Sequence, residues 1–146
     1  SECQIMEIFD VVVAKEINES SKSDIKDINS VSNDDLILDI GPKTSNSYVE
    51  IIKKSSTIIW NGPLGLFEID QFSSGTERIA QAIAQCDGYS IAGGGDTVSA
   101  IEKFGVTDGI SYISTGGGAF LEFICDKTLP SIKAIKNHAK NREKGP

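Results

Sequence analysis

Three glycine-rich turns carry the residues of this sequence that could do chemistry. They are Gly93–Thr97 (GGGDT), Ser114–Ala119 (STGGGA) and Trp60–Gly65 (WNGPLG), and each continues a short apolar run. Because glycine lacks a Cβ atom, backbone N–H groups in such turns can approach a phosphate oxygen closely. A helix that begins at the turn adds partial positive charge at its N-terminus. The pattern therefore predicts a binding site for phosphate groups.

Asp96 is the acidic residue within these turns. An ionised carboxylate repels a bare phosphate, so Asp96 indicates that a Mg²⁺ ion lies between the two. Thr97 and Thr115 can add hydroxyl donors. The alternative is that Asp96 only caps the following helix and that the glycines form plain tight turns. Two Gly-Gly-Gly turns after consecutive strands favour the phosphate site, although neither a P-loop nor a dinucleotide fingerprint is present.

The elements that must position these turns are predicted from hydrophobic patterning. Apolar runs that predict strands occur at residues 10–14, 36–40, 57–61, 89–93 and 111–114. They are continuous rather than alternating, as is typical of parallel strands that are covered on both faces. Helical patterns occur at residues 45–54, 75–86 and 97–104, and Gly105 follows the last one as a natural C-cap. Strands that alternate with helices in this way indicate βαβ units.

Two further segments show no such alternation. Residues 15–35 are polar and predict a surface excursion, with a short hairpin or edge strand around residues 25–31. A short helix is expected from Pro130 to about Ala139, followed by a charged tail over residues 140–146.

The composition limits the class of partner. The formal net charge is −7, which disfavours nucleic acid and anionic membrane surfaces because those partners need clustered Lys and Arg. No apolar run approaches the ~20 residues that cross a bilayer, and residues 1–9 lack the features of a signal peptide. Cys3, Cys86 and Cys125 are far apart, so neither a zinc site nor a disulfide framework is indicated. A cytoplasmic protein is expected.

Five motifs in a fixed order give the sequence a family resemblance. They are DIGPKT at 39–44, WNGPLGLFE at 60–68, GGGDT at 93–97, EKFGV at 102–106 and STGGGA at 114–119. This set resembles phosphoglycerate kinase over about residues 10–129, in the later part of the C-terminal, nucleotide-binding domain. The resemblance implies an incomplete domain of the α/β class over residues 1–139. Its expected architecture is a three-layer, Rossmann-like parallel sheet with helices on both faces.

The resemblance implies a role for each matching residue. The nucleotide-binding set would be Gly93, Gly94, Gly95, Asp96, Thr97, Glu68, Asn61, Pro63, Leu66 and Leu38. Asp96 would hold Mg²⁺ through the nucleotide, Glu68 would contact the ribose hydroxyls, and Leu38, Pro63 and Leu66 would line an adenine pocket. Gly116, Gly117 and Gly118 would face the phosphoryl group in transfer, where donors count most.

The implied reaction is reversible phosphoryl transfer between 1,3-bisphosphoglycerate with ADP and 3-phosphoglycerate with ATP. The phosphoglycerate would bind through a domain that this chain lacks, the intact enzyme would be a monomer, and the isolated chain would be inactive or nearly so. Two alternatives are a stand-alone, non-catalytic nucleotide- or phosphate-binding module and a purely structural or interaction role.

Other residues receive simpler interpretations. Trp60 is expected to fill the core rather than stack on a base, and His138 is expected to be solvated. Lys43 is interpreted as a surface or helix-start lysine. Asp39 is expected to position the Gly-Pro turn that follows it and is not assigned to a ligand.

Overall fold

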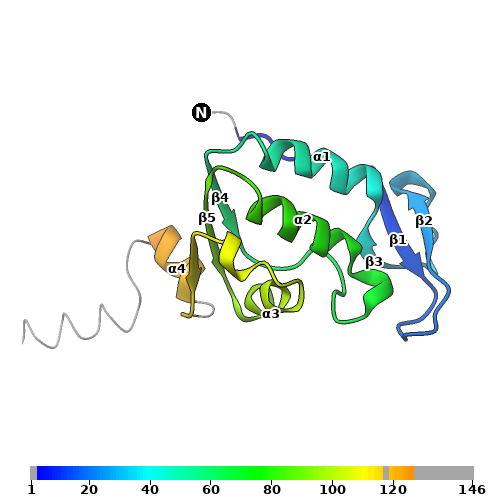
Figure 1. The fold of residues 1–146 in the computed structure, drawn as a ribbon. Helices are drawn as coiled ribbons and strands as arrows, with labels where there is room; N and C mark the ends of the chain where they lie inside the picture. The colour runs from blue at the N-terminus through cyan, green and yellow to red at the C-terminus, as the bar shows by residue number, and fades with distance from the viewer. Residues whose placement is uncertain (1–2, 117–118, 127–146) are drawn as a thin grey trace, which may run out of the picture.

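The computed structural model describes residues 3–116 and 119–126. Ten helices and strands follow one another along these residues (Figure 1). They are β1 (Asp10–Ala14), β2 (Asp24–Asp27), β3 (Leu36–Ile40), α1 (Pro42–Ile52), β4 (Thr57–Trp60), α2 (Ser74–Ala84), β5 (Tyr89–Gly93), α3 (Gly95–Lys103), β6 (Tyr112–Ser114) and α4 (Ala119–Asp126). Every strand predicted from an apolar run is present. The helix expected after Pro130, the charged tail and His138 lie outside the described residues.

A parallel sheet with the strand order β4-β5-β6 forms the half of the molecule that contains the glycine-rich turns. One face of this sheet packs against α2 and α3, because side chains of β4 and β5 share one buried cluster with both helices. On the other face, the Phe120 ring of α4 lies where a Cβ atom of Gly93 would be. The predicted α/β class, with layers on both faces of a parallel sheet, is confirmed.

A second sheet has the order β2-β1-β3 and is antiparallel throughout. The expectation that the runs at 10–14 and 36–40 belong to a parallel sheet was therefore wrong. All five residues of β1 are buried, and β1 is the central strand between β2 and β3. A continuous apolar run indicates burial on both faces, and it carries no information about strand direction. The expected edge strand in the polar excursion is β2, which pairs with β1 alone.

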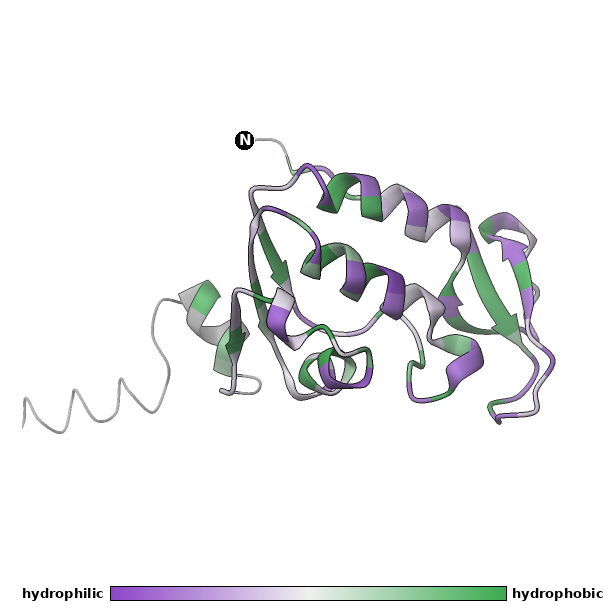
Figure 2. Ribbon diagram, viewed as in Figure 1, coloured by the Kyte–Doolittle hydropathy of each residue, from purple (hydrophilic) through white to green (hydrophobic). Residues whose placement is uncertain are grey.

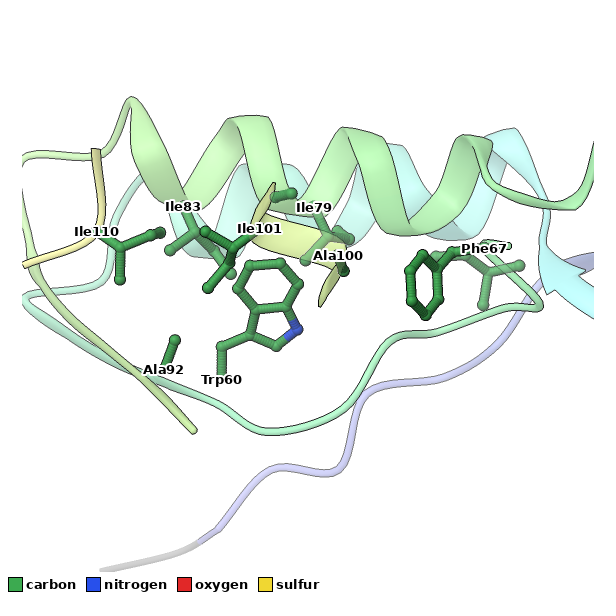
Figure 3. Close-up of a cluster of buried hydrophobic side chains, with 10 residues drawn as sticks. Trp60, Phe67, Ile79, Ile83, Ala92, Ala100, Ile101 and Ile110 are labelled. Atoms are coloured by element: carbon green, nitrogen blue, oxygen red, sulfur yellow. The ribbon is translucent and has the colours of Figure 1, made fainter. Parts of the chain in front are cut away.

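The main core lies between the parallel sheet and its helices. Trp60 is 5% exposed and packs among Ile79, Ile83 and Ile101, as Figure 3 shows. Its indole N–H donates to the carbonyl of Gly62 at 2.9 Å. The interpretation of Trp60 as a core residue is confirmed. Figure 2 shows that β1 and β4 are hydrophobic, that the edge strand β2 is largely hydrophilic, and that polar and apolar residues alternate along α1 and α2.

The start of α1 is held by a residue from a distant strand. The Asp10 carboxylate, which is buried, accepts hydrogen bonds from the backbone N–H groups of Lys43 (3.0 Å) and Thr44 (2.8 Å). Lys43 is exposed and lies in the first turn of α1, as interpreted. The Gly41–Pro42 turn is therefore positioned by Asp10 of β1, and the role predicted for Asp39 was wrong. Among the described residues, no helix is long and apolar enough to cross a membrane.

Candidate functional site

The glycine-rich turns meet at one edge of the parallel sheet. Trp60 is aligned with Ala92, and Gly93 is aligned with Ser114, so the chain leaves β4, β5 and β6 at neighbouring points. The carboxyl ends of parallel strands are where open α/β sheets bind ligands. The structure thus brings together the three turns that the sequence singled out.

Asn61, Gly94 and Thr97 form the centre of this edge. Gly94 has a φ of +95°, which side-chain-bearing residues rarely adopt. A Cβ atom there would lie 3.3 Å from the Asn61 amide oxygen and 3.5 Å from the Thr97 hydroxyl. The Thr97 side chain is fully buried, and its oxygen accepts a hydrogen bond from the Gly62 N–H at 2.7 Å. The turns after β4 and β5 are therefore joined directly.

Asp96 lies in the first turn of α3, and its side chain is exposed. The N-cap of α3 is Gly94, which makes no side-chain capping bond, so the alternative in which Asp96 caps the helix does not describe this structure. A Cβ atom on Gly95 would meet nothing within 4 Å, so open space lies beside this turn. Within residues 3–116 and 119–126, no group of three or more acidic, Cys or His side chains could hold a metal. A Mg²⁺ ion at Asp96 would thus need phosphate or water for most of its oxygen ligands.

An apolar hollow of about 370 Å³ lies beside the turn after β4. Leu38, Pro63 and Leu66, the residues expected to line an adenine pocket, all contribute to its wall. Ile17 and Ile37 also line it and are each more than half exposed. Sequence reasoning missed these two isoleucines. No local pattern marks Ile17 and Ile37, because their exposure is set by the tertiary structure.

Asp39 lies beneath the same wall and is 2% exposed. Its carboxylate accepts hydrogen bonds from the N–H groups of Gly75 (2.7 Å) and Ile40 (2.9 Å). Burial raises the pKa of Asp39 to about 6, and the two N–H donors oppose that shift. Gly65 packs so closely that a Cβ atom on it would collide with the Asp39 carboxylate. Asp39 therefore joins the loop after β4 to the first turn of α2.

The loop from Asn61 to Ser73, here called the β4–α2 loop, is also held by side chains of α2 and α3. Thr76 of α2, which is fully buried, accepts hydrogen bonds from the N–H groups of Leu64 (3.1 Å) and Gly65 (3.3 Å). The Lys103 ammonium donates to the carbonyl of Phe67 and to the Asp70 carboxylate, both at 2.7 Å. Neither Thr76 nor Lys103 was identified from the sequence, although Lys103 lies in the EKFGV motif. Glu68, the expected ribose contact, is exposed on this loop.

The third turn follows β6. Gly116 is exposed, and its carbonyl accepts a hydrogen bond from the Ala119 N–H at 3.3 Å, just where α4 begins. Gly116 thus precedes a helix, as the sequence predicted. Gly117 and Gly118 lie outside the described residues, and their assignment to the moving phosphoryl group stays a prediction.

Comparison with known proteins gives this geometry a context. Residues 1–127 match the sequence model of a family described as phosphoglycerate kinase. The structure of phosphoglycerate kinase from Coxiella burnetii is 50% identical and superposes with a TM-score of 0.81, covering 86% of this chain and 32% of that chain. Phosphoglycerate kinase from Pyrococcus horikoshii OT3 is 36% identical with a TM-score of 0.74, covering 88% of this chain and 31% of that chain. This chain spans about a third of the length of those two structures.

Proposed function

Because this chain belongs to the phosphoglycerate kinase family, we propose that it binds the magnesium nucleotide in reversible phosphoryl transfer between 1,3-bisphosphoglycerate with ADP and 3-phosphoglycerate with ATP. One observation carries the proposal. Asn61, Gly94 and Thr97 converge at the carboxyl edge of the parallel sheet, and residues 63–66 of the loop that follows Asn61 line an apolar hollow. The turns at the sheet edge suit the phosphates of a nucleotide, and the apolar hollow suits its purine base.

The phosphate end of the nucleotide lies at the first turn of α3 in this proposal. The open space beside Gly95 allows close approach of a phosphate, and the N-terminus of α3 supplies partial positive charge. Asp96 binds Mg²⁺, which would neutralise phosphate charge and polarise the transferring group. Because the chain carries a net charge of −7, such local positive fields are needed for any phosphate ligand.

The nucleoside end lies along the β4–α2 loop. Leu38, Pro63 and Leu66 contact the adenine ring in the apolar hollow, and Glu68 accepts hydrogen bonds from the ribose hydroxyls. The backbone of Gly116 to Gly118, at the start of α4, faces the phosphoryl group during transfer. Donors in that position stabilise charge that develops in the transition state. The phosphoglycerate binds to a part of the enzyme that this chain does not contain.

The metal-dependent step of the proposal can be tested on this chain. We expect Mg-ADP to produce saturable amide shifts at residues 93–97 in a ¹⁵N NMR titration, which also measures millimolar dissociation constants. Asp96→Asn should weaken Mg-ADP binding about tenfold and leave metal-free ADP unaffected. Asp108→Asn removes the same charge from an exposed position after α3 and is the matched control. Absence of saturable shifts, or equal effects of the two variants, would contradict the proposal.

Catalysis needs a separate test on the longest protein expressed from the reading frame that contains this sequence. That protein should form ATP from ADP and 1,3-bisphosphoglycerate, whereas the 146-residue chain should bind nucleotide with little or no turnover. Binding by both proteins without turnover in either would instead favour a non-catalytic nucleotide-binding module.

A further inference from the structure

We propose that Lys103 is a positioning residue that fixes the backbone on both sides of Glu68, so that ribose recognition depends on a cation from the far end of α3. This inference rests on the proposed function, because that function assigns the ribose contact to Glu68. It assigns to Lys103 no contact with the nucleotide itself.

The contacts of the Lys103 ammonium group carry the inference. Its nitrogen lies 2.7 Å from the carbonyl oxygen of Phe67 and 3.4 Å from the carbonyl oxygen of Glu68. These two carbonyls belong to the peptide groups that flank the Cα atom of Glu68. The third partner is the Asp70 carboxylate at 2.7 Å. A lysine ammonium has three N–H donors, so these three acceptors use its full capacity.

The side chain of Phe67 provides a second anchor at the same point. Phe67 is 4% exposed, and its ring meets the ring of Phe104 edge-on, with 6.4 Å between centroids. Lys103 and Phe104 are consecutive at the end of α3, so one end of one helix holds both the side chain and the carbonyl of Phe67. Glu68 is exposed immediately beyond these contacts. Its position is therefore set by the backbone that Lys103 holds.

The geometry also explains why α3 is suited to this task. Thr97, in its first turn, accepts a hydrogen bond from Gly62 at the start of the β4–α2 loop. Lys103, the last residue of the helix, holds the loop near Glu68. Lys103 lies six positions after Thr97, which is about 9 Å along the helix. One rigid element thereby sets the spacing between the groups assigned to the phosphates and the group assigned to the ribose.

The ion pair with Asp70 does not account for the arrangement. The Asp70 side chain is 94% exposed, and pairs of this kind contribute little to stability. The two backbone carbonyls are the partners that place Glu68. Asp70→Asn keeps the shape of the side chain and removes its charge. It is therefore a control that tests the ion pair separately from the contacts of Lys103 with the two carbonyls.

The experiment compares ADP with 2′,3′-dideoxy-ADP, both with Mg²⁺, by NMR titration of the 146-residue chain. The dissociation constant for 2′,3′-dideoxy-ADP divided by that for ADP measures recognition of the ribose hydroxyls. A general loss of affinity changes both constants equally and leaves this ratio unchanged. Lys103→Met removes the donors and keeps most of the apolar stem. We expect it to reduce the ratio three- to tenfold and to leave the dissociation constant for the dideoxy compound unchanged. Lys103→Arg should restore part of the ratio, and Asp70→Asn should leave it unchanged.

Glu68→Gln separates failure of this inference from failure of the proposed function. If Glu68→Gln does not change the ratio, or if the wild-type chain shows no saturable shift, the ribose assignment is wrong and the inference falls with it. If Glu68→Gln abolishes the preference and Lys103→Met does not change it, only the inference is overturned. A combined variant should show no further loss beyond Glu68→Gln alone. If Lys103→Met loses the native spectrum, Lys103→Gln is measured in its place, and the ratio should fall by the same factor.

Discussion

The hydroxyl oxygen of Thr97 lies 2.7 Å from the backbone nitrogen of Gly62 and accepts its hydrogen bond. The two residues are 35 positions apart, and each follows the carboxyl end of a parallel strand. This contact joins the GGGDT turn to the loop that carries Asn61 and the apolar hollow. A role of Thr97 toward phosphate stays a prediction, and its role in the fold can be tested first.

Replacing Thr97 by Val keeps the shape of the side chain and removes the acceptor. The partly buried Gly62 N–H would lose its partner, which costs up to about 1–3 kcal/mol. We expect the free energy of unfolding, measured with urea, to fall by that amount. Thr97→Ser keeps the hydroxyl and should recover most of the loss. A Val variant as stable as the wild type would show that the contact is dispensable.

Gly94 and Gly95 make a matched pair of adjacent substitutions. Gly94→Ala places a side chain at a φ of +95° and should destabilise the protein by about 1–3 kcal/mol. Gly95 is the first residue of α3 and has open space around it, so Gly95→Ala should not destabilise the fold. Because that open space is where the phosphates are proposed to lie, Gly95→Ala should still weaken Mg-ADP binding. Equal effects of the two variants on stability would contradict this view.

Asp39 should make the protein more stable in mild acid. Burial raises the pKa of Asp39 from 3.8 to about 6 in the folded state, so the folded protein binds this proton more tightly than the unfolded chain. The resulting stability is fully present below pH 3.8 and is lost as the pH rises through about 6. Asp39→Asn cannot titrate. The difference in unfolding free energy between wild type and variant should therefore grow in favour of the wild type from pH 7 to pH 5, and parallel profiles would refute this.

Asp10 should have the opposite pH dependence. Burial alone would raise its pKa, but hydrogen bonds from Thr44 and Lys43 hold the pKa of Asp10 below 3.8. Its contribution is present above pH 3.8 and is lost as the pH falls through the lower folded-state value. Asp10→Asn should thus cost less stability at pH 3 than at pH 5. Because Asp10 caps α1 from another strand, Asp10→Ala should cost about 1–2 kcal/mol near neutral pH, as measured by urea unfolding.

Local patterning predicted most of the elements and the family. Strands at 10–14, 36–40 and 89–93 form with the predicted bounds, and Gly105 ends α3 with a φ of +65°. Glycine-rich turns after strands indicated the edge of the sheet at which a ligand would bind. Glycine alone lacks a Cβ atom, so its presence in these turns directly indicates a positive φ or a close approach. The five ordered motifs indicated phosphoglycerate kinase, which the family match over residues 1–127 confirms.

Strand direction and the supports of the site were decided by the tertiary structure. The sequence of β1 reports burial on both faces, yet its antiparallel pairing with β2 and β3 depends on which segments are brought beside it. Asp10 rather than Asp39 holds the turn before α1, because only the fold brings residue 10 within 3.0 Å of residue 43. The sequence assigned no role to Lys103 beyond its place in the EKFGV motif. Its contacts with the Phe67 and Glu68 carbonyls arise 35 or 36 residues away along the chain, and no local pattern encodes a backbone partner at that distance.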